Sequence, residues 1–309
     1  MKHWGLALGA CIATTALPSA AQLTAEQLAT MEIKTEKVGE GLSVLFGNGG
    51  NIGVSIGADG VLIVDDGQFN QLMPRTLEAM RAVGAHKVDL AINTHFHVDH
   101  ADGNLVLGPT GTWIIAQANS RQMLTKDNVI NTVVRPPFPQ KAYPAAALPV
   151  ATFTDKMQLN YNGEVIDLMH VAPAHTTGDA AVIFRNHNAV HLGDVFNNAG
   201  YPFIDTDNGG DLDGTIAFCE AVLKELKPGA TVIPGHGEVA TYDDLVAYIA
   251  MLKGVRAKLT ELIRSGATLE QVIAAKPTAE WDARYGDPTR IVNRGYAAVS
   301  RQNVSPRPR

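Results

Sequence analysis

Short apolar runs separated by glycine-containing turns open the chain and predict consecutive β-strands. Between residues 33 and 65 these runs are "IKTEKV", "GLSVLFG", "NIGVSIG" and "GVLIVDDG". β-Branched residues favour strands, and glycine favours the turns between them. We therefore expect four strands in this first segment.

A helical period follows these strands. The segment "NQLMPRTLEAMRAVG" has apolar residues at helical spacing and predicts a helix that ends at Gly84. "VDLAIN" then predicts a short buried strand, and we expect a helix to begin near Asp102. "TWIIA" predicts another strand, and "QANSRQMLTKD" predicts the helix after it.

The second half repeats this order of strands and helices. Strands are predicted within 151–170 and 181–192, where "LNYNGEVIDLMHV" is typical of a hairpin. Helices follow in "DLDGTIAFCEAVLKEL", "TYDDLVAYIAMLKGVRAKLTELIRSG" and the short "TLEQVIAAK". Strands followed by helices in each half, 33–126 and 151–264, predict an α/β fold with two β-sheets and outer helices, an αββα sandwich. We expect a single domain over 22–309 with a helical C-terminal extension.

The segment "RPPFPQKAYPAAALP", residues 135–149, lies between the two halves. Its five prolines remove backbone donors and restrict the chain, which predicts no regular structure here. Two alternatives stay open. The segment is either an inert crossing over the surface or a lid beside a site.

Composition and charge indicate which kinds of binding partner the protein can have. The chain has 309 residues, 46% of them hydrophobic, and a formal net charge of −6. These values predict a globular protein with a substantial core. No basic stripe is visible, so we expect a small-molecule substrate and no nucleic acid. The sequence does not predict the oligomeric state.

The N-terminus resembles an export signal. Lys2 precedes the apolar run "WGLALGACIATTAL", and "PSAAQ" offers a small-residue cleavage site before Gln22. We interpret residues 1–21 as a signal peptide, the alternative being a buried N-terminal helix. The run is too short to favour a membrane anchor. We therefore expect a periplasmic or secreted protein. Its remaining cysteine, Cys219, lies at helical spacing and is expected to be buried.

The segment "NTHFHVDHADGN" concentrates metal-ligand residue types behind a buried strand. In an extended segment His95 and His97 project to the same side, and Asp99 continues the alternation. His100 follows at the turn. One short loop can therefore present four ligands of the kind that zinc prefers. The alternative is a polar loop that caps the next helix.

Three later residues each follow an apolar strand at the start of a loop: His175 in "APAHTTGD", Asp194 in "NAVHLGD" and His236 in "TVIPGHGE". Binding sites in layered α/β proteins gather at strand ends. Each residue alone has a structural explanation, but together they complete a ligand set. Asp65 and Asp66 also follow a strand, and either orient ligands from behind or form a turn. The remaining histidines match no ligand motif and are expected to be surface or core residues: His86, His170, His187 and His191.

The segments "THFHVDH", "AHTTGD", "HLGDVF" and "PGHGE" resemble, in this order, the metal motifs of the metallo-β-lactamase superfamily of hydrolases. The resemblance runs from about residue 38 to 264 and implies the αββα fold with two zinc ions per chain. It implies that one zinc ion is bound by His95, His97 and His175. It implies that the second is bound by Asp99, His100 and His236, and that Asp194 bridges the two.

The resemblance also implies a reaction. Two zinc ions that share a hydroxide supply a nucleophile, because zinc lowers the pKa of bound water to about 7. Asp99 is the expected catalytic residue, which orients this hydroxide while ligating zinc. Iron or manganese stay open as alternatives because carboxylates supply part of the ligand shell.

The expected reaction is hydrolysis of an activated cyclic amide, with β-lactams as the first candidate and antibiotic resistance as the implied role. Asp194 stands where many β-lactamases carry Cys or Ser, which keeps a lactonase or a glyoxalase II-like thioesterase open. A zinc-binding protein without catalysis is the alternative from another class. Phosphodiesters are disfavoured, because only Arg135 and Lys141 lie near the motifs. The expected substrate contacts lie on two loops between the motifs: Phe138, Tyr143, Asn197, Asn198 and Tyr201.

Overall fold

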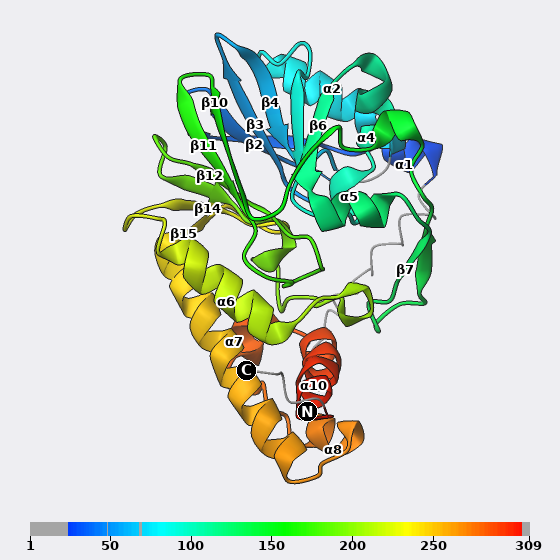
Figure 1. Cartoon of the computed structure of the whole chain (residues 1–309), viewed down its shortest axis with the longest axis vertical. Coiled ribbons are helices and arrows are strands. Elements are labelled where there is room, and N and C mark those ends of the chain that lie inside the picture. The colour runs from blue at the N-terminus through cyan, green and yellow to red at the C-terminus, as the bar shows by residue number, and fades with distance from the viewer. Residues whose placement is uncertain (1–23, 48, 68–69, 305–309) are drawn as a thin grey trace, which may run out of the picture.

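A computed structural model describes residues 24–304 other than 48, 68 and 69 (Figure 1). The predicted signal peptide, 1–21, lies outside these residues. Within the described part, no helix is both long and apolar enough to cross a membrane. A short capped helix, α1 (Ala25–Thr30), leads into the first sheet.

Seven strands form the first sheet, in the spatial order β1-β2-β3-β4-β5-β6-β9. Neighbouring strands among β1 to β4 run antiparallel, whereas β4, β5, β6 and β9 run parallel. Parallel strands need a crossover, and α2 (Met73–Ala82) supplies it between β4 and β5. The strands are β1 (Lys34–Gly39), β2 (Leu42–Phe46), β3 (Ile52–Gly57), β4 (Gly60–Val64), β5 (Leu90–Asn93), β6 (Trp113–Gln117) and β9 (Ala151–Phe153).

Six strands form the second sheet, in the order β10-β11-β12-β13-β14-β15. The predicted hairpin is β10 with β11, and its turn places Asn162 at φ 59° and Gly163 at φ 70°. Positive φ at both positions is the geometry that two-residue hairpin turns require. The strands are β10 (Lys156–Tyr161), β11 (Glu164–Met169), β12 (Ala181–Phe184), β13 (Ala189–His191), β14 (Thr231–Ile233) and β15 (Ala240–Thr241).

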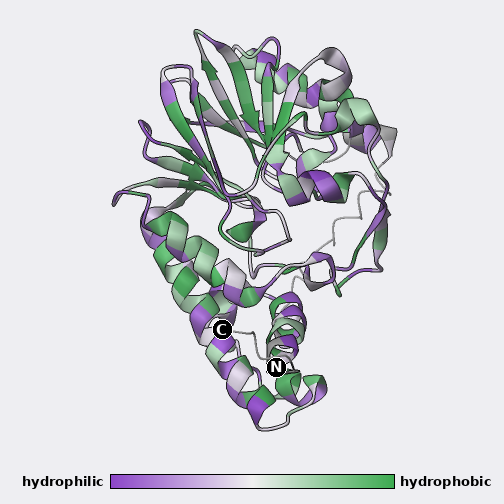
Figure 2. Cartoon of the chain, in the orientation of Figure 1, coloured by the Kyte–Doolittle hydropathy of each residue, from purple (hydrophilic) through white to green (hydrophobic). Residues whose placement is uncertain are grey.

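Alternating side chains pack the two sheets face to face. Leu62 and Val64 of β4 point inward and meet Ile166 and Leu168 of β11, whereas Ile63 points outward into the cluster that includes α2. Outward residues of the second sheet pack under α6 (Leu212–Leu223) and α7 (Tyr242–Arg264). Figures 1 and 2 show apolar strands at the centre with helices outside both sheets. The predicted αββα sandwich is therefore confirmed.

The last helices pack against α7, away from the sheets (Figure 1). They are α8 (Leu269–Ala274), α9 (Asp282–Tyr285) and α10 (Thr289–Val304). The sequence patterns predict α8, but none of the helices expected from them covers α10. Its buried Ile291, Val292, Ala298 and Val299 follow helical spacing and hold it in the cluster around α7.

Two expectations need correction. The Pro-rich segment contains regular structure, because β8 (Phe138–Gln140) pairs with β7 (Asn128–Ile130) as a two-stranded sheet. A proline fits there since Pro139 stands opposite only one neighbouring strand.

The helix expected near Asp102 begins earlier, as α3 (Val98–Ala101) followed by α4 (Asn104–Leu107). The helix expected over 117–127 is α5 (Ala118–Leu124).

Candidate metal centre

Each predicted ligand follows a strand, at one edge of the sandwich. His95, His97, Asp99 and His100 come after β5 of the first sheet, the last two within α3. The other three follow strands of the second sheet: His175 after β11, Asp194 after β13 and His236 after β14. Because the two sheets face each other, their loops meet at this edge. The structure brings all seven residues into two groups, each with ligand atoms within 4.8 Å of one another.

The first group contains only imidazoles: His95, His97 and His175. Each ring has a hydrogen-bond partner on its far nitrogen. His175 Nδ1 lies 2.6 Å from the Phe203 carbonyl, and His97 Nε2 lies 3.0 Å from Asp205 Oδ2. These acceptors take the ring protons, so the opposite nitrogens keep free lone pairs.

Those free nitrogens face one another. His175 Nε2 lies 3.0 Å from His97 Nδ1, and His95 Nε2 is buried without a hydrogen-bond partner among the described residues. Burial, with the neighbouring imidazoles, holds the pKa of His95 well below its usual range. Neutral nitrogens with converging lone pairs repel unless a cation lies between them.

The second group mixes carboxylates and imidazoles: Asp99, His100, Asp194 and His236. His236 Nε2 lies 3.1 Å from Asp99 Oδ2, and His100 Nδ1 lies 2.7 Å from Asp65 Oδ2. Burial disfavours a charged His236 ring, but Asp194 and Asp99 outweigh it and raise its pKa to about 10. Despite burial, His100 and His236 lower the pKa of Asp99 below its usual range. This group therefore attracts positive charge.

Asp194 lies between the two groups. Its Oδ2 is 3.5 Å from His175 Nε2 of the first group, and its Oδ1 is 3.2 Å from His100 Nε2 and 3.3 Å from His236 Nε2 of the second. One carboxylate thus reaches both groups, as a bridging ligand must.

The donor set fits two metal ions. His95 Nε2 is buried without a hydrogen bond within the described chain, and His100 Nε2 and Asp194 Oδ1 also form no hydrogen bond but lie 3.2 Å apart as an ion pair. Buried polar atoms are normally satisfied, and a bound ion would satisfy these three. Gly235 adds room, because a Cβ there would collide with Asp194.

Side chains behind the ligands orient them. Asp65 orients a ligand, which is one of the two interpretations that the sequence left open. It adopts φ 60° and accepts from Thr94 N at 2.7 Å while facing His100. Asp66 instead accepts from Gly103 N at 3.0 Å and contacts no ligand side chain. None of the four remaining histidines belongs to a ligand group of the described chain.

Sequence reasoning missed two supports of the site. Asp205 orients His97, yet it lies 108 residues away in the chain. Asn51 donates from Nδ2 to the carbonyls of Pro234 and Gly237, at 2.9 and 2.8 Å, and so fixes the loop that carries His236. Neither residue belongs to a motif. Only the fold brings them to the ligands.

A cavity of about 710 Å³ opens over both groups. Its floor includes His97, Asp99, Asp194 and His236, and its walls come from the end of β7 and the residues after it, the Pro-rich segment, the loop after Asp194 and residues 285–290. This volume suits a small molecule. The walls are formed by Ile130, Thr132, Val134, Arg135, Phe138, Asn197, Ala199, Gly200, Tyr201, Phe203, Tyr285, Asp287 and Arg290.

Three predicted substrate contacts, Phe138, Asn197 and Tyr201, line this cavity, and the other two do not. Tyr143 is 8% exposed and packs in a separate buried cluster, with its hydroxyl 3.3 Å from Asp102. Asn198 donates from Nδ2 to the Glu238 carbonyl at 2.9 Å, which anchors the neighbouring loop instead. Tyr143 and Asn198 therefore lie outside the cavity lining, and substrate contact by the five residues stays a prediction.

Comparison with known proteins agrees with the fold. Residues 45–236 match the metallo-beta-lactamase superfamily, and the chain belongs to this family. A probable metallo-hydrolase of Methanocaldococcus jannaschii is 28% identical over 204 residues, which cover 63% of this chain and 90% of that protein.

Solved structures show the same architecture. The DIM-1 metallo-beta-lactamase gives a TM-score of 0.56 at 17% identity, over 72% of this chain and 97% of that chain. A metallo-beta-lactamase from Pontibacter korlensis gives 0.58 at 12% identity, over 72% and 99%. At such identities the likeness shows the fold, and the substrate has to be argued from the site itself.

Proposed function

We propose that the protein is an exported dinuclear zinc hydrolase that opens activated cyclic acyl compounds, with β-lactams as the first candidate. The observation that carries this proposal is the position of Asp194. It reaches both ligand groups at the floor of a 710 Å³ cavity. Export is inferred from the signal-like residues 1–21.

Zinc suits these ligands, which are nitrogen and carboxylate oxygen without thiolate. Bound there, zinc would polarise an acyl oxygen and activate water at neutral pH. The side chains around the ion would supply the other catalytic roles. Asp99 is 24% exposed at the cavity floor, so one carboxylate can both ligate and orient a water molecule.

An enzyme accounts for this geometry better than a zinc carrier does. A structural zinc site is closed by four protein ligands. Here Asp99 and His236 are 24% and 27% exposed toward the cavity, which leaves room for a substrate beside them.

Lactones and thioesters are the second candidates, because the bridging residue is Asp194. Its charge beneath the ions makes the site less electrophilic than one bridged by a neutral group. We therefore expect weak or narrow β-lactam hydrolysis. The test compares kcat/KM for a penicillin, a cephalosporin, a carbapenem, a lactone and a thioester at one zinc concentration. A lactone or thioester that exceeds every β-lactam by about a hundredfold, roughly 2.7 kcal/mol, would overturn the β-lactam assignment.

Asp99→Asn tests the catalytic role on whichever substrate is turned over. The amide keeps the shape but cannot act as a base and ligates zinc poorly, so kcat should fall by about 10²–10⁴ while the fold persists. Circular dichroism and elemental analysis check the fold and the metal content. Asp243→Asn, on the exposed face of α7, is the control and should keep wild-type turnover. An Asp99→Asn enzyme as active as wild type would contradict the assignment.

A further inference from the structure

Two arginines from distant parts of the chain line the cavity over the ligand groups. Arg135 lies in the Pro-rich segment, just before β8, and Arg290 lies in the first turn of α10. The sequence suggested Arg135 and Lys141 as nearby cations, and of these two only Arg135 lines the cavity. The fold adds Arg290 because α10 packs back toward the cavity.

Neither guanidinium has a hydrogen-bond or ion-pair partner among residues 24–304 as described. Arg294, one turn further along α10, shows the contrast. It lies 2.9 Å from Asp207 Oδ2 and 3.2 Å from the Thr206 hydroxyl, and it is buried in the fold. Arg290 is also partly buried, and this burial together with the charge of Arg135 lowers its pKa. Two like charges facing one cavity without partners favour an anion between them.

The local charge selects the kind of anion. Asp287 lines the same cavity, and its Oδ1 accepts from both Thr289 N, at 3.0 Å, and the Thr289 hydroxyl, at 2.6 Å. This carboxylate therefore holds the start of α10. Away from the ligand groups, the two arginines and one aspartate of this lining leave a single positive charge, which matches a monoanion better than a dianion.

We propose that Arg135 and Arg290 form a subsite for a carboxylate group of the substrate, while the acyl group to be cleaved lies over the ligand groups. The inference rests on the proposed hydrolase function and restricts its substrates to acyl compounds that carry a carboxylate. The planar guanidinium of arginine suits a carboxylate because it can donate two parallel hydrogen bonds. Arg290 lies beyond 45–236, so the C-terminal helices of this chain, and not the matched family region, supply it.

Binding of stable amides tests the subsite apart from turnover. The probes are the monoanilides of succinic, glutaric and adipic acid, so that no spacing is assumed, with butyranilide as the neutral counterpart. Calorimetry on the zinc-loaded protein should show that the best acid binds at least tenfold more tightly than butyranilide. Arg290→Gln should remove at least tenfold of that affinity, and Arg135→Gln less, because Arg135 is exposed. Butyranilide binding should change by no more than about twofold.

Two further variants sharpen the result. Arg290→Lys keeps the charge but loses the two-pronged donor geometry, so it should restore only part of the affinity. Lys141→Gln is the matched control, since Lys141 lies on the same Pro-rich segment and pairs with Asp127 at 2.6 Å, outside the cavity lining. It should bind every anilide as wild type does.

Specific outcomes overturn the proposal. Equal binding of the best acid to wild type and Arg290→Gln would place the carboxylate on the metal ions instead. A phosphonate in place of the carboxylate that binds more than tenfold better would assign the arginines to a phosphate group. Failure of the proposed hydrolytic function can be distinguished from failure of the carboxylate subsite. A protein that hydrolyses no acyl compound but binds the acids through Arg290 would keep the subsite and lose only the proposed reaction.

Discussion

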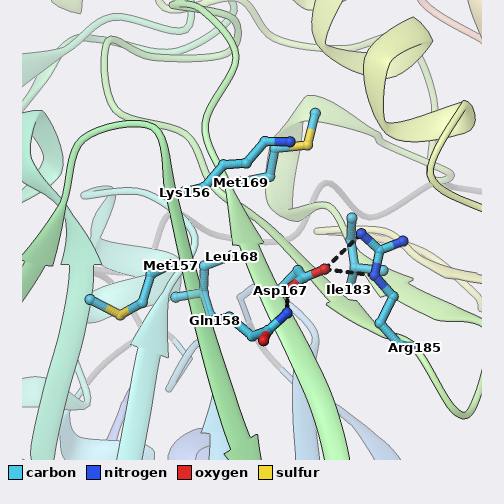
Figure 3. Close-up of a pocket in the computed structure, with 8 residues that line it drawn as sticks. All are labelled: Lys156, Met157, Gln158, Asp167, Leu168, Met169, Ile183 and Arg185. Atoms are coloured by element: carbon cyan, nitrogen blue, oxygen red, sulfur yellow. Dashed lines mark hydrogen bonds and ion pairs between the residues drawn. The ribbon is translucent and has the colours of Figure 1, made fainter.

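The cavity over the ligand groups can be compared with a second one, of about 380 Å³, on strands β10 and β11 of the second sheet (Figure 3). Both have charged linings. In the second cavity the charges satisfy one another. Asp167 accepts from Gln158 at 2.7 Å and from Arg185 at 2.6 Å, and Arg185 also donates to Glu225 at 2.8 Å.

The metal cavity is arranged in the opposite way. Imidazole nitrogens face imidazole nitrogens, the buried His95 Nε2 lacks a hydrogen bond, and the partly buried Arg290 and the exposed Arg135 lack partners within the described residues. Such an arrangement costs stability in the absence of a ligand, because buried polar groups are left unsatisfied. Polar groups without hydrogen-bond or ion-pair partners therefore distinguish the metal cavity from the second cavity, whereas volume and charge alone do not.

Exchanging one aspartate for asparagine in each cavity gives the largest expected contrast. Asp194→Asn removes the bridging charge, so metal content should fall and kcat/KM should drop at least about a thousandfold, roughly 4 kcal/mol. Asp167→Asn removes an ion-pair partner of Arg185 instead. It should keep both metal ions and wild-type kcat/KM, with a stability loss of about 1–2 kcal/mol. Elemental analysis, kinetics and denaturant unfolding measure the three quantities.

The comparison would break if Asp167→Asn altered the metal content, or if Asp194→Asn left it intact. The first result would show that the cavity on β10 and β11 is coupled to the ligands. The second would remove the bridge on which the proposed function depends.

The sequence predicts the sandwich and the ligands for the same reason. Strand periodicity and strand-end motifs are local patterns, so "VDLAIN" before His95 and "TVIPGHGE" around His236 can be read directly. Seven ligand residues from four loops are brought together as the motifs predict.

Non-local contacts escape such reading. Asp205 supports His97 from a different part of the chain, and Arg290 reaches the cavity only because α10 folds back. The orientation of Tyr143 likewise could not be predicted from the sequence. Its loop flanks the cavity, but the ring turns into a buried cluster beside Asp102, and no local pattern indicates which way an aromatic ring on a loop will face.

Asp65→Asn tests whether the residues behind the ligands matter, at a smaller expected effect. Asparagine tolerates the positive φ of this position, so the backbone should persist. The amide accepts the His100 proton more weakly than the carboxylate does. Affinity for one of the two metal ions should therefore fall about 10–100-fold. Competition with a metal chelator measures it, and Asp66→Asn, which touches no ligand side chain, is the comparison. Equal losses in both variants would point to general destabilisation.

The smallest expected effect is a difference between the two ligand groups in the number of protons that they release when metal binds. In the metal-free protein the pKa of His236 is raised to about 10, so its ring is protonated at pH 7.5, and the pKa of His100 is raised as well. His95 and His175 have lowered pKa values, because burial disfavours their charged forms, and their nitrogens are free at this pH. Metal must therefore displace a proton from His236, in the second group, but none from His95 or His175.

Metal affinity of that group should therefore rise with pH, about tenfold per pH unit for each proton displaced, and level off near pH 10 for His236. His95 and His175, whose pKa values are lowered, should contribute no such rise between pH 7.5 and 9. Calorimetry in two buffers of different ionisation enthalpy counts the released protons. We expect one to two protons at pH 7.5 for the ion lost in His100→Ala, and about none for the ion lost in His95→Ala. Equal proton release for both ions would contradict the charge difference between the groups, since both would then be held by equally protonated rings.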